Sequence, residues 1–387
     1  MSGIHDGRRL DVLVEMNSAD LRIGATNDVL DLAELAAPAG ARFTICGPLT
    51  EAFAREAERR GARTIAGSSC VFSRRGLPFY LADVARWLVR LARLRPDVVH
   101  LNYPGYGASL GCAAWLCGIP VVSRAGPYVA GNPSNRWIAA YIANCRAHAE
   151  SLLESPLADR VVVTGDLFRP ERVNATRALE RPLPPRRAGV VRVVFLGQLV
   201  ERKGLHVLIE AFAGIDEPSE LLLVGGDWSA SGYPARIKAL VGERGLGSRV
   251  HFENHRQDVG AILGTADLFV LPSLSEARPR SVIEAMSVGL PVVASDAGGL
   301  PSLVGHETTG LLAPPGDAAM LCDALTRLIR SAALRERMGA AGRRRIENEC
   351  RPERTAAAYV AVYRRLHTAT VAAVPDGAAI GAVPRVR

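Results

Sequence analysis

Short apolar runs alternate with amphipathic stretches along most of this 387-residue chain, and this alternation constrains its fold more than any other feature. The apolar runs have the length of buried parallel strands, and the stretches between them carry apolar residues at helical spacings of three and four. In the first part, strands are predicted at 10–15, 42–46, 97–101, 119–122 and 160–164, and helices at 27–37, 51–60, 80–95 and 107–117. Such a repeat predicts an α/β fold with a doubly wound parallel sheet.

A segment rich in proline and arginine, residues 177–187, interrupts this alternation and indicates an interdomain linker. A second alternation follows, with strands predicted at 191–196, 220–224, 249–252, 267–271 and 290–294, and helices at 205–212, 234–243, 259–263 and 318–330. We therefore expect two Rossmann-like domains that face a cleft. The expected division is a first domain at 1–176, a linker at 177–189, a second domain at 190–352, a helix at 353–367 that is a candidate to pack back on the first domain, and a disordered tail at 368–387.

Composition and charge exclude several functional classes. The net charge of +8 suits phosphates or anionic lipid, but an aromatic content of 5% argues against single-stranded nucleic acid as a partner. Seven scattered cysteines without a CxxC pair indicate neither a disulfide framework nor a zinc site, and we expect no metal. No apolar stretch reaches membrane-spanning length, so we expect a cytoplasmic protein, peripheral at most at the inner face of the membrane.

Two glutamates eight positions apart, Glu276 and Glu284, form the most informative local pattern. The strand predicted at 267–271 ends before Pro272, so Glu276 lies in a loop at the carboxyl end of that strand. Pro279 suits the first turn of a helix, which places Glu284 on that helix. Ligands of open α/β sheets bind beyond the carboxyl ends of the strands, and carboxylates accept hydrogen bonds from hydroxyl groups. The pattern therefore favours a sugar or a ribose as ligand.

A basic loop follows the strand predicted at 191–196 and runs from Gly197 to Gly204. Gly197 permits a close approach of the backbone, while Arg202 and Lys203 add two cations beside a helix N-terminus. A solvated basic turn is the alternative, but the position at the end of a strand favours an anion such as a diphosphate. A glycine pair that begins with Gly298 follows another predicted strand, and its backbone could donate to the same ligand.

Taken together, these motifs resemble the nucleotide-sugar half of retaining glycosyltransferases with the GT-B fold, the family 4-like, group 1 enzymes. The Glu-x7-Glu signature of that family matches Glu276 and Glu284, and its basic loop matches residues 197–204. The segment 285–296 matches the stretch that follows the second glutamate. The resemblance is strong over most of the second half and loose over the first.

The resemblance implies a role for each matching residue. Arg202 and Lys203 would hold the donor diphosphate, Glu284 would bind ribose hydroxyls, and Glu276 would contact the transferred sugar. Arg202, Lys203 and Glu276 are thus the predicted catalytic residues. The other predicted donor-binding residues are Gly24, Gly197, His255, Arg256, Arg280, Ser281, Glu284 and Gly298.

The first half departs from the family pattern in two places. Only one glycine, Gly24, stands where the family often has a glycine pair, and Arg124 lies in the loop where many members carry a histidine. Arg124 is a candidate residue on the acceptor side, and a structural arginine at a strand end is an equal alternative.

The expected function is transfer of a hexose-like sugar from a nucleotide diphosphate sugar to a glycan, lipid-linked or small-molecule acceptor, with retention of anomeric configuration. No cofactor is expected beyond this donor substrate. A sugar-nucleotide epimerase on the same fold and a non-catalytic nucleotide-sugar-binding protein are the alternatives. The helix predicted at 80–95, with Tyr80, Trp87 and arginines from Arg90 to Arg95, suits peripheral contact with a membrane, although we favour a helix that simply covers the sheet.

Overall fold

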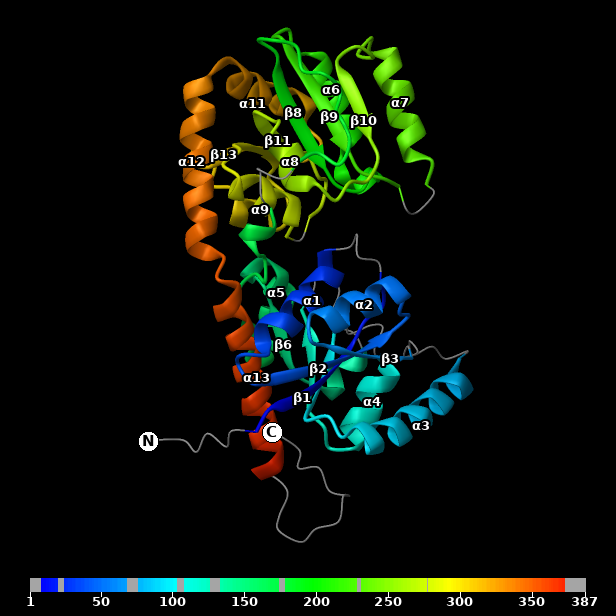
Figure 1. Ribbon diagram of the computed structural model, residues 1–387. Helices are drawn as coiled ribbons and strands as arrows, with labels where there is room; N and C mark the ends of the chain where they lie inside the picture. Colours follow the sequence, from blue (N-terminus) through cyan, green and yellow to red (C-terminus); the bar gives the residue numbers. More distant parts are fainter. Residues whose placement is uncertain are drawn as a thin grey trace. The chain divides into compact units, whose positions relative to one another are not determined.

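The computed structural model describes residues 8–19, 24–67, 76–102, 108–125, 133–173, 178–227, 231–276 and 278–372. The chain divides into two compact units. The first comprises Met1–Phe168 and Arg351–Arg387, and the second is Arg169–Cys350. Each unit is a parallel sheet flanked by helices (Figure 1).

The sheet of the first unit has seven strands in the order β3-β2-β1-β4-β5-β6-β7, and every pair is parallel. The strands are β1 (Leu10–Glu15), β2 (Ala41–Gly47), β3 (Arg63–Ala66), β4 (Val98–Leu101), β5 (Val121–Arg124), β6 (Ile138–Ala143) and β7 (Val161–Val163). The helices are α1 (Gly24–Ala36), α2 (Glu51–Arg59), α3 (Leu77–Leu94), α4 (Ala108–Leu116), α5 (Arg146–Leu153) and α13 (Pro352–Ala372).

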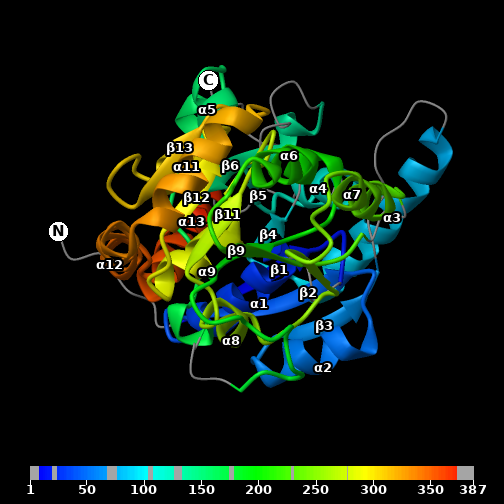
Figure 2. The ribbon, with the colours of Figure 1, turned by 90° about the horizontal axis from the view of Figure 1, so that it is seen from above.

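Helices cover both faces of this sheet because successive strand residues point to opposite sides. On β1, Val12 and Val14 belong to a core cluster shared with α1, α2 and α13, while Leu13 belongs to a second cluster shared with α3, α4 and α5. Figure 2 shows α3 and α4 side by side on their face of the sheet. Burial on both faces explains why the strands are almost continuously apolar.

The sheet of the second unit has six strands in the order β10-β9-β8-β11-β12-β13, again all parallel. Its strands are β8 (Val191–Leu196), β9 (Ser219–Val224), β10 (Val250–Glu253), β11 (Leu268–Leu271), β12 (Val292–Ser295) and β13 (Gly310–Ala313). Its helices are α6 (Leu205–Ala213), α7 (Tyr233–Glu243), α8 (Val259–Leu263), α9 (Arg280–Ser287), α10 (Leu300–Leu303), α11 (Ala318–Arg330) and α12 (Ala332–Glu349). The predicted α/β class with two doubly wound parallel sheets is confirmed.

Several elements escaped the sequence prediction, and each has a weak pattern. Strand β3 has only four residues, none of them buried, and β6 is rich in alanine. Helix α12 is largely polar and contains Gly339, and glycine disfavours the interior of a helix. In the structure Gly339 is needed, because a Cβ there would lie 2.0 Å from the carbonyl oxygen of Gly289. Close packing of α12 on the turn after α9 therefore explains this glycine.

The last described helix, α13, belongs to the first unit and contacts α1 and β4. Its Tyr363 hydroxyl lies 2.6 Å from Nδ1 of His100 on β4, and burial lowers the pKa of His100 to about 3. The predicted tail from residue 368 was wrong for residues 368–372, because α13 continues to Ala372; Thr370 donates to the carbonyl of Leu366. After Pro352, the next proline in the sequence is Pro375, so no proline interrupts the helix before Ala372. The rest of the predicted tail, residues 373–387, lies outside the described residues.

The segment predicted as a linker, 177–189, is fastened to the second unit over its described part. The backbone N–H of Glu180 donates to Asp258 at 2.8 Å, and Arg186 pairs with Asp267 at 2.7 Å. The carbonyl of Pro184 accepts a hydrogen bond from Arg192 at 2.7 Å. These contacts explain why the division between the units falls at Phe168 and not within the proline-arginine segment.

Truncation of Trp87 is expected to destabilise the first unit strongly. Its indole is fully buried between α3 and the sheet, so Trp87→Ala should leave a cavity and lower the free energy of unfolding by about 3–5 kcal/mol. Urea unfolding followed by circular dichroism measures this loss. Trp115→Ala, at a partly exposed tryptophan on the neighbouring α4, is the control and should cost far less. Equal losses in the two variants would contradict the assignment of Trp87 to the core.

Candidate functional site

Four loops of the second unit follow four strands that are neighbours in the sheet, β9, β8, β11 and β12. Because these strands are parallel, their carboxyl ends lie at one edge of the sheet, and the loops gather there. The loops begin at Gly225 after β9, Gly197 after β8, Pro272 after β11 and Asp296 after β12. This edge carries most of the residues that the sequence predicted for the site.

Two of these loops approach the loop after β11 backbone to backbone. Gly204 has a φ of 67°, and a Cβ there would lie 2.0 Å from the carbonyl oxygen of Pro272. Gly298 has a φ of 56°, and its Cβ would lie 1.9 Å from the carbonyl oxygen of Glu276. Only glycine suits both conditions, because a left-handed backbone and a missing side chain are needed together. The two glycines fix the loop that carries Glu276 from either side.

Lys203 and Glu276 form an ion pair between the loops after β8 and β11. Both side chains are nearly enclosed, with 10% and 9% of their surface exposed. Arg202 also reaches this carboxylate, at 3.3 Å, but its side chain is 48% exposed, and the same guanidinium donates to the carbonyl of Ser275 at 2.9 Å. The three residues predicted as catalytic therefore lie together, with one buried cation and one cation at the surface.

Opposing effects act on the pKa of Lys203. Burial lowers the pKa below the usual lysine value because it penalises the charged ammonium, and Arg202 acts in the same direction. Glu276 opposes both effects through its charge and its hydrogen bond. The carboxylate thus helps to keep a buried ammonium protonated at the edge of the sheet.

Replacement of Glu276 by glutamine should lower the pKa of Lys203 further, because the charge that favours the ammonium is removed. Reductive methylation with ¹³C-formaldehyde followed by NMR titration measures this pKa directly. The chain has two lysines, Lys203 and Lys238, so Lys238→Arg leaves Lys203 as the only lysine and assigns its signal. An unchanged or raised pKa in Glu276→Gln would contradict the arrangement.

Helix α9 begins four residues after Glu276 and carries three further predicted residues, Arg280, Ser281 and Glu284. The prediction placed Pro279 in the first turn; it is the N-cap residue, in an extended conformation. The helix buries Val282, Ile283, Ala285 and Met286, and leaves Glu284 partly exposed. Glu284 thus lies on α9 beside the face that packs into the core.

Arg256 differs from the other predicted donor-binding residues because its guanidinium is buried. It pairs with Asp258, with Nε 2.9 Å from Oδ1, and donates to the carbonyl of Arg181 at 2.8 Å. The hydrogen bond to Asp258 raises the pKa of Arg256. These contacts connect the segment before β8 to the start of α8, so Arg256 stabilises the fold of the second unit. The neighbouring His255, in contrast, is partly exposed.

Two predicted residues belong to the first unit. Gly24 is the first residue of α1, and Arg124 is the last residue of β5. Arg124 pairs with Asp28 of α1 at 3.0 Å, and both side chains are largely buried. The pair connects the carboxyl end of β5 to the helix that begins at Gly24.

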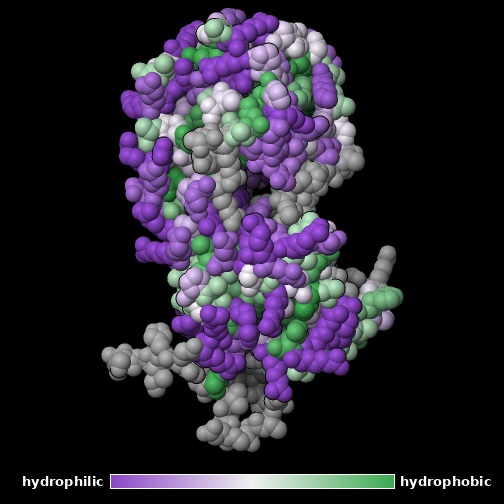
Figure 3. Space-filling view, in the orientation of Figure 1, coloured by the Kyte–Doolittle hydropathy of each residue, from purple (hydrophilic) through white to green (hydrophobic). Residues whose placement is uncertain are grey.

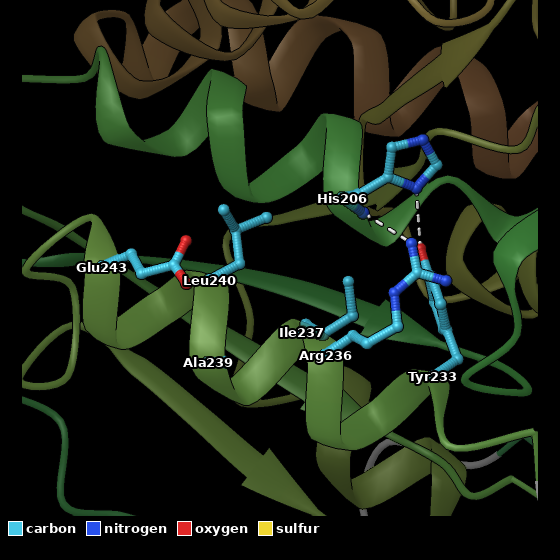
Figure 4. Close-up of a pocket in the computed structure, with 7 residues that line it drawn as sticks. All are labelled: His206, Tyr233, Arg236, Ile237, Ala239, Leu240 and Glu243. Atoms are coloured by element: carbon cyan, nitrogen blue, oxygen red, sulfur yellow. Dashed lines mark hydrogen bonds between the residues drawn. The ribbon is translucent and has the colours of Figure 1, made fainter.

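A pocket of about 310 Å³ lies between α6 and α7, and none of the predicted site residues lines it (Figure 4). Its lining residues are His206, Tyr233, Arg236, Ile237, Ala239, Leu240 and Glu243. The Tyr233 hydroxyl lies 2.8 Å from Nδ1 of His206 and accepts from its backbone N–H at 3.1 Å. These bonds tie the start of α7 to the start of α6, directly after Gly204.

In the described part of the chain, no cluster of three His, Cys, Asp or Glu side chains could hold a metal ion.

Sequence reasoning did not single out two residues that complete the site. Ser273, fully buried two residues after the end of β11, donates from its hydroxyl to Glu276 at 3.3 Å. Gly204 was taken only as the end of the basic loop, although its contact with Pro272 joins two loops. A serine just after a buried strand was a signal for Ser273; the contact of Gly204 depends on strand order, which the sequence does not give.

Comparison with known proteins agrees with this arrangement. The model of the family described as Glycosyl transferases group 1 matches residues 181–345, and that of Glycosyltransferase Family 4 matches residues 23–165. The two matches together cover most of both units. The chain belongs to the glycosyltransferases with the GT-B fold, and the predicted family resemblance is confirmed.

Among curated proteins, the chain is similar to the amylovoran biosynthesis glycosyltransferase AmsK of Erwinia amylovora, with 33% identity over 206 residues, which are 50% of this chain and 47% of that protein. It is 37% identical over 169 residues to the phosphatidyl-myo-inositol mannosyltransferase of Mycobacterium leprae, covering 41% of this chain and 43% of that protein. The matched segments thus span about half the length of these relatives, or less.

Solved structures share the fold over nearly their whole length. A glycosyltransferase from Rickettsia africae has a TM-score of 0.80 at 18% identity, covering 92% of this chain and 98% of that one. HepE from Anabaena has a TM-score of 0.77 at 21% identity, covering 92% of this chain and 100% of that one.

Among the described residues, no helix has the length and apolar character needed to span a bilayer.

Proposed function

We propose that this protein transfers a hexose-like sugar from a nucleotide diphosphate sugar to a glycan, lipid-linked or small-molecule acceptor, with retention of anomeric configuration. The observation that carries the proposal is the enclosed Lys203–Glu276 pair at the carboxyl edge of the second sheet. A cation there suits phosphate, and a carboxylate suits sugar hydroxyls. The solved structure of HepE in complex with UDP and glucose supports this class of donor.

Lys203 and Arg202 would act on the leaving diphosphate. As the bond between sugar and phosphate breaks, negative charge grows on the phosphate oxygens, and cations already in place stabilise that charge without rearrangement. In the structure Lys203 is bound to Glu276, so an arriving diphosphate shares or replaces this carboxylate as its partner. Arg202, half exposed and held by the carbonyl of Ser275, would provide a second contact from the rim.

The glutamates would orient the rest of the donor. Glu276 would accept hydrogen bonds from hydroxyls of the transferred sugar, and Glu284 from the ribose. Further contacts to the donor would come from Gly197, Gly298, Arg280, Ser281 and His255. In the first unit, Gly24 would approach the donor phosphates, and Arg124 would lie on the acceptor side. Arg256, held by Asp258, would support the loop after β10 from inside.

The use of lysine in this chain supports a special role for Lys203. Among 47 lysine and arginine residues, the lysines are Lys203 and Lys238 alone. Arginine therefore serves at almost every other basic position, whereas the enclosed place beside Glu276 is held by a lysine. A compact ammonium fits there and can meet a phosphate oxygen as a point charge.

The test is acceptor-dependent release of nucleoside diphosphate from a panel of sugar nucleotides. The proposal expects release only when an acceptor is present, with a product whose anomeric configuration, measured by NMR, equals that of the donor. Conversion of the donor without acceptor would identify an epimerase instead. Donor binding without turnover over a broad acceptor panel would identify a binding protein, and an inverted product would refute retention.

A further inference from the structure

The outer face of α3 is apolar, which is unusual for a helix that covers a sheet in water. Its inner face, with Tyr80 and Trp87, is buried against the sheet, so the interpretation that these two residues meet a membrane is wrong. The opposite face carries an apolar stripe at spacings of three and four. Its exposed residues are Pro78, Leu81, Ala82, Ala85, Val89 and Ala92.

Large side chains make this stripe conspicuous. Leu81 is 57% exposed and Val89 56%, and Phe79 beside them is 78% exposed. Figures 1 and 2 show the N-terminal end of α3 extending beyond the neighbouring elements of its unit, and green atoms gather there in Figure 3. On the neighbouring α4, Trp115 and Leu116 are also partly exposed. Exposed apolar area of this kind marks an interaction surface.

Charge indicates which partner the surface fits. Arg86, Arg90 and Arg93 follow one flank of the stripe at helical spacing, and Arg95 caps the helix. The only acid in this helix, Asp83, is buried, pairs with Arg86 and accepts a hydrogen bond from Ser109. The exposed face therefore combines apolar side chains with positive charge alone. Two copies of this face would bring like charges together, which disfavours self-association.

We propose that the outer face of α3 binds the surface of an anionic lipid bilayer. Phe79, Leu81 and Val89 would enter the boundary between headgroups and acyl chains, while the flanking arginines would meet anionic headgroups. This surface belongs to the first unit and the proposed donor residues Lys203 and Glu276 to the second, so it stands independently of the proposed function.

Co-sedimentation with vesicles tests the proposal on the full-length chain. Vesicles of phosphatidylcholine with about a third phosphatidylglycerol should bind the protein, and pure phosphatidylcholine should bind much less. Raising the salt from about 0.05 to about 0.5 M should weaken binding, because screening shortens the reach of the arginines. Arg93→Gln should weaken binding about fivefold, as expected for one charge near the surface. Arg55→Gln on α2 is the matched control and should bind normally.

The apolar part of the surface needs its own variant. Phe79→Ser combined with Leu81→Ser and Val89→Ser should reduce binding at least tenfold, while Met320→Ser, at a residue of the second unit that is 47% exposed, should leave it unchanged. Circular dichroism checks that the triple variant folds. Equal binding by the triple variant and the parent would overturn the proposal. So would dimers in sedimentation velocity that the triple variant abolishes, with no binding to either vesicle.

Discussion

Lys203→Met is expected to reduce sugar transfer by about tenfold to over a hundredfold. A charge-assisted hydrogen bond contributes roughly 1.5–3 kcal/mol, which corresponds to about tenfold to over a hundredfold in rate. The substitution also leaves Glu276 enclosed without its lysine partner, and loss of one member of a buried pair is strongly destabilising. Both transfer and stability should therefore fall, and kcat/KM together with urea unfolding measures the two effects.

A double variant separates catalysis from folding. In Lys203→Met combined with Glu276→Gln, no unpaired charge remains in the enclosed site, so the free energy of unfolding should recover towards that of the parent. Transfer should stay lost, because the cation that stabilises the leaving diphosphate is absent. Lys238→Met, at an exposed lysine whose ammonium lies 5.4 Å from the ring of Phe252, is the matched control and should transfer sugar normally. Near-normal transfer by the double variant would refute the role of Lys203.

The fold was predictable because buried parallel strands and amphipathic helices leave strong periodic patterns. The carboxyl ends of the strands follow from the same patterns, so the sequence by itself predicts that Lys203 and Glu276 lie on ligand-facing loops. Their contact depends on β8 lying next to β11, a neighbour relation between strands that are distant in sequence. Strand order is a tertiary property, so the sequence indicated two loops but not the ion pair between them.

Arg256 shows that the direction of a side chain cannot be predicted from the sequence pattern alone. A basic residue after a strand is a reasonable candidate for ligand contact, and His255-Arg256 has that pattern. The structure instead turns Arg256 inward to Asp258, two residues further along. Whether an arginine meets a ligand or an internal carboxylate is decided by which way its side chain points, and residue type and spacing alone do not determine that direction.

Gly298→Ala should reduce transfer by about a hundredfold although it removes no polar group. The added Cβ would lie 1.9 Å from the carbonyl oxygen of Glu276, and the residue has a φ of 56°, so one of the two loops must move. The backbone N–H of Gly299, which donates to the same carbonyl at 2.9 Å, would move as well. A displacement of about 1 Å in a positioning group can cost on the order of a hundredfold in rate.

Gly245→Ala separates this clash from ordinary backbone strain. Gly245 has a φ of 67°, and its Cβ would meet no atom within 4 Å. The left-handed conformation should cost both variants about 1–2 kcal/mol in unfolding free energy, measured by urea denaturation. Only Gly298→Ala should also lose transfer, because only there does the new methyl group displace Glu276 from Lys203. If both variants kept full kcat/KM, the contact between Gly298 and Glu276 would not matter for catalysis, and the site would depend on the ion pair alone.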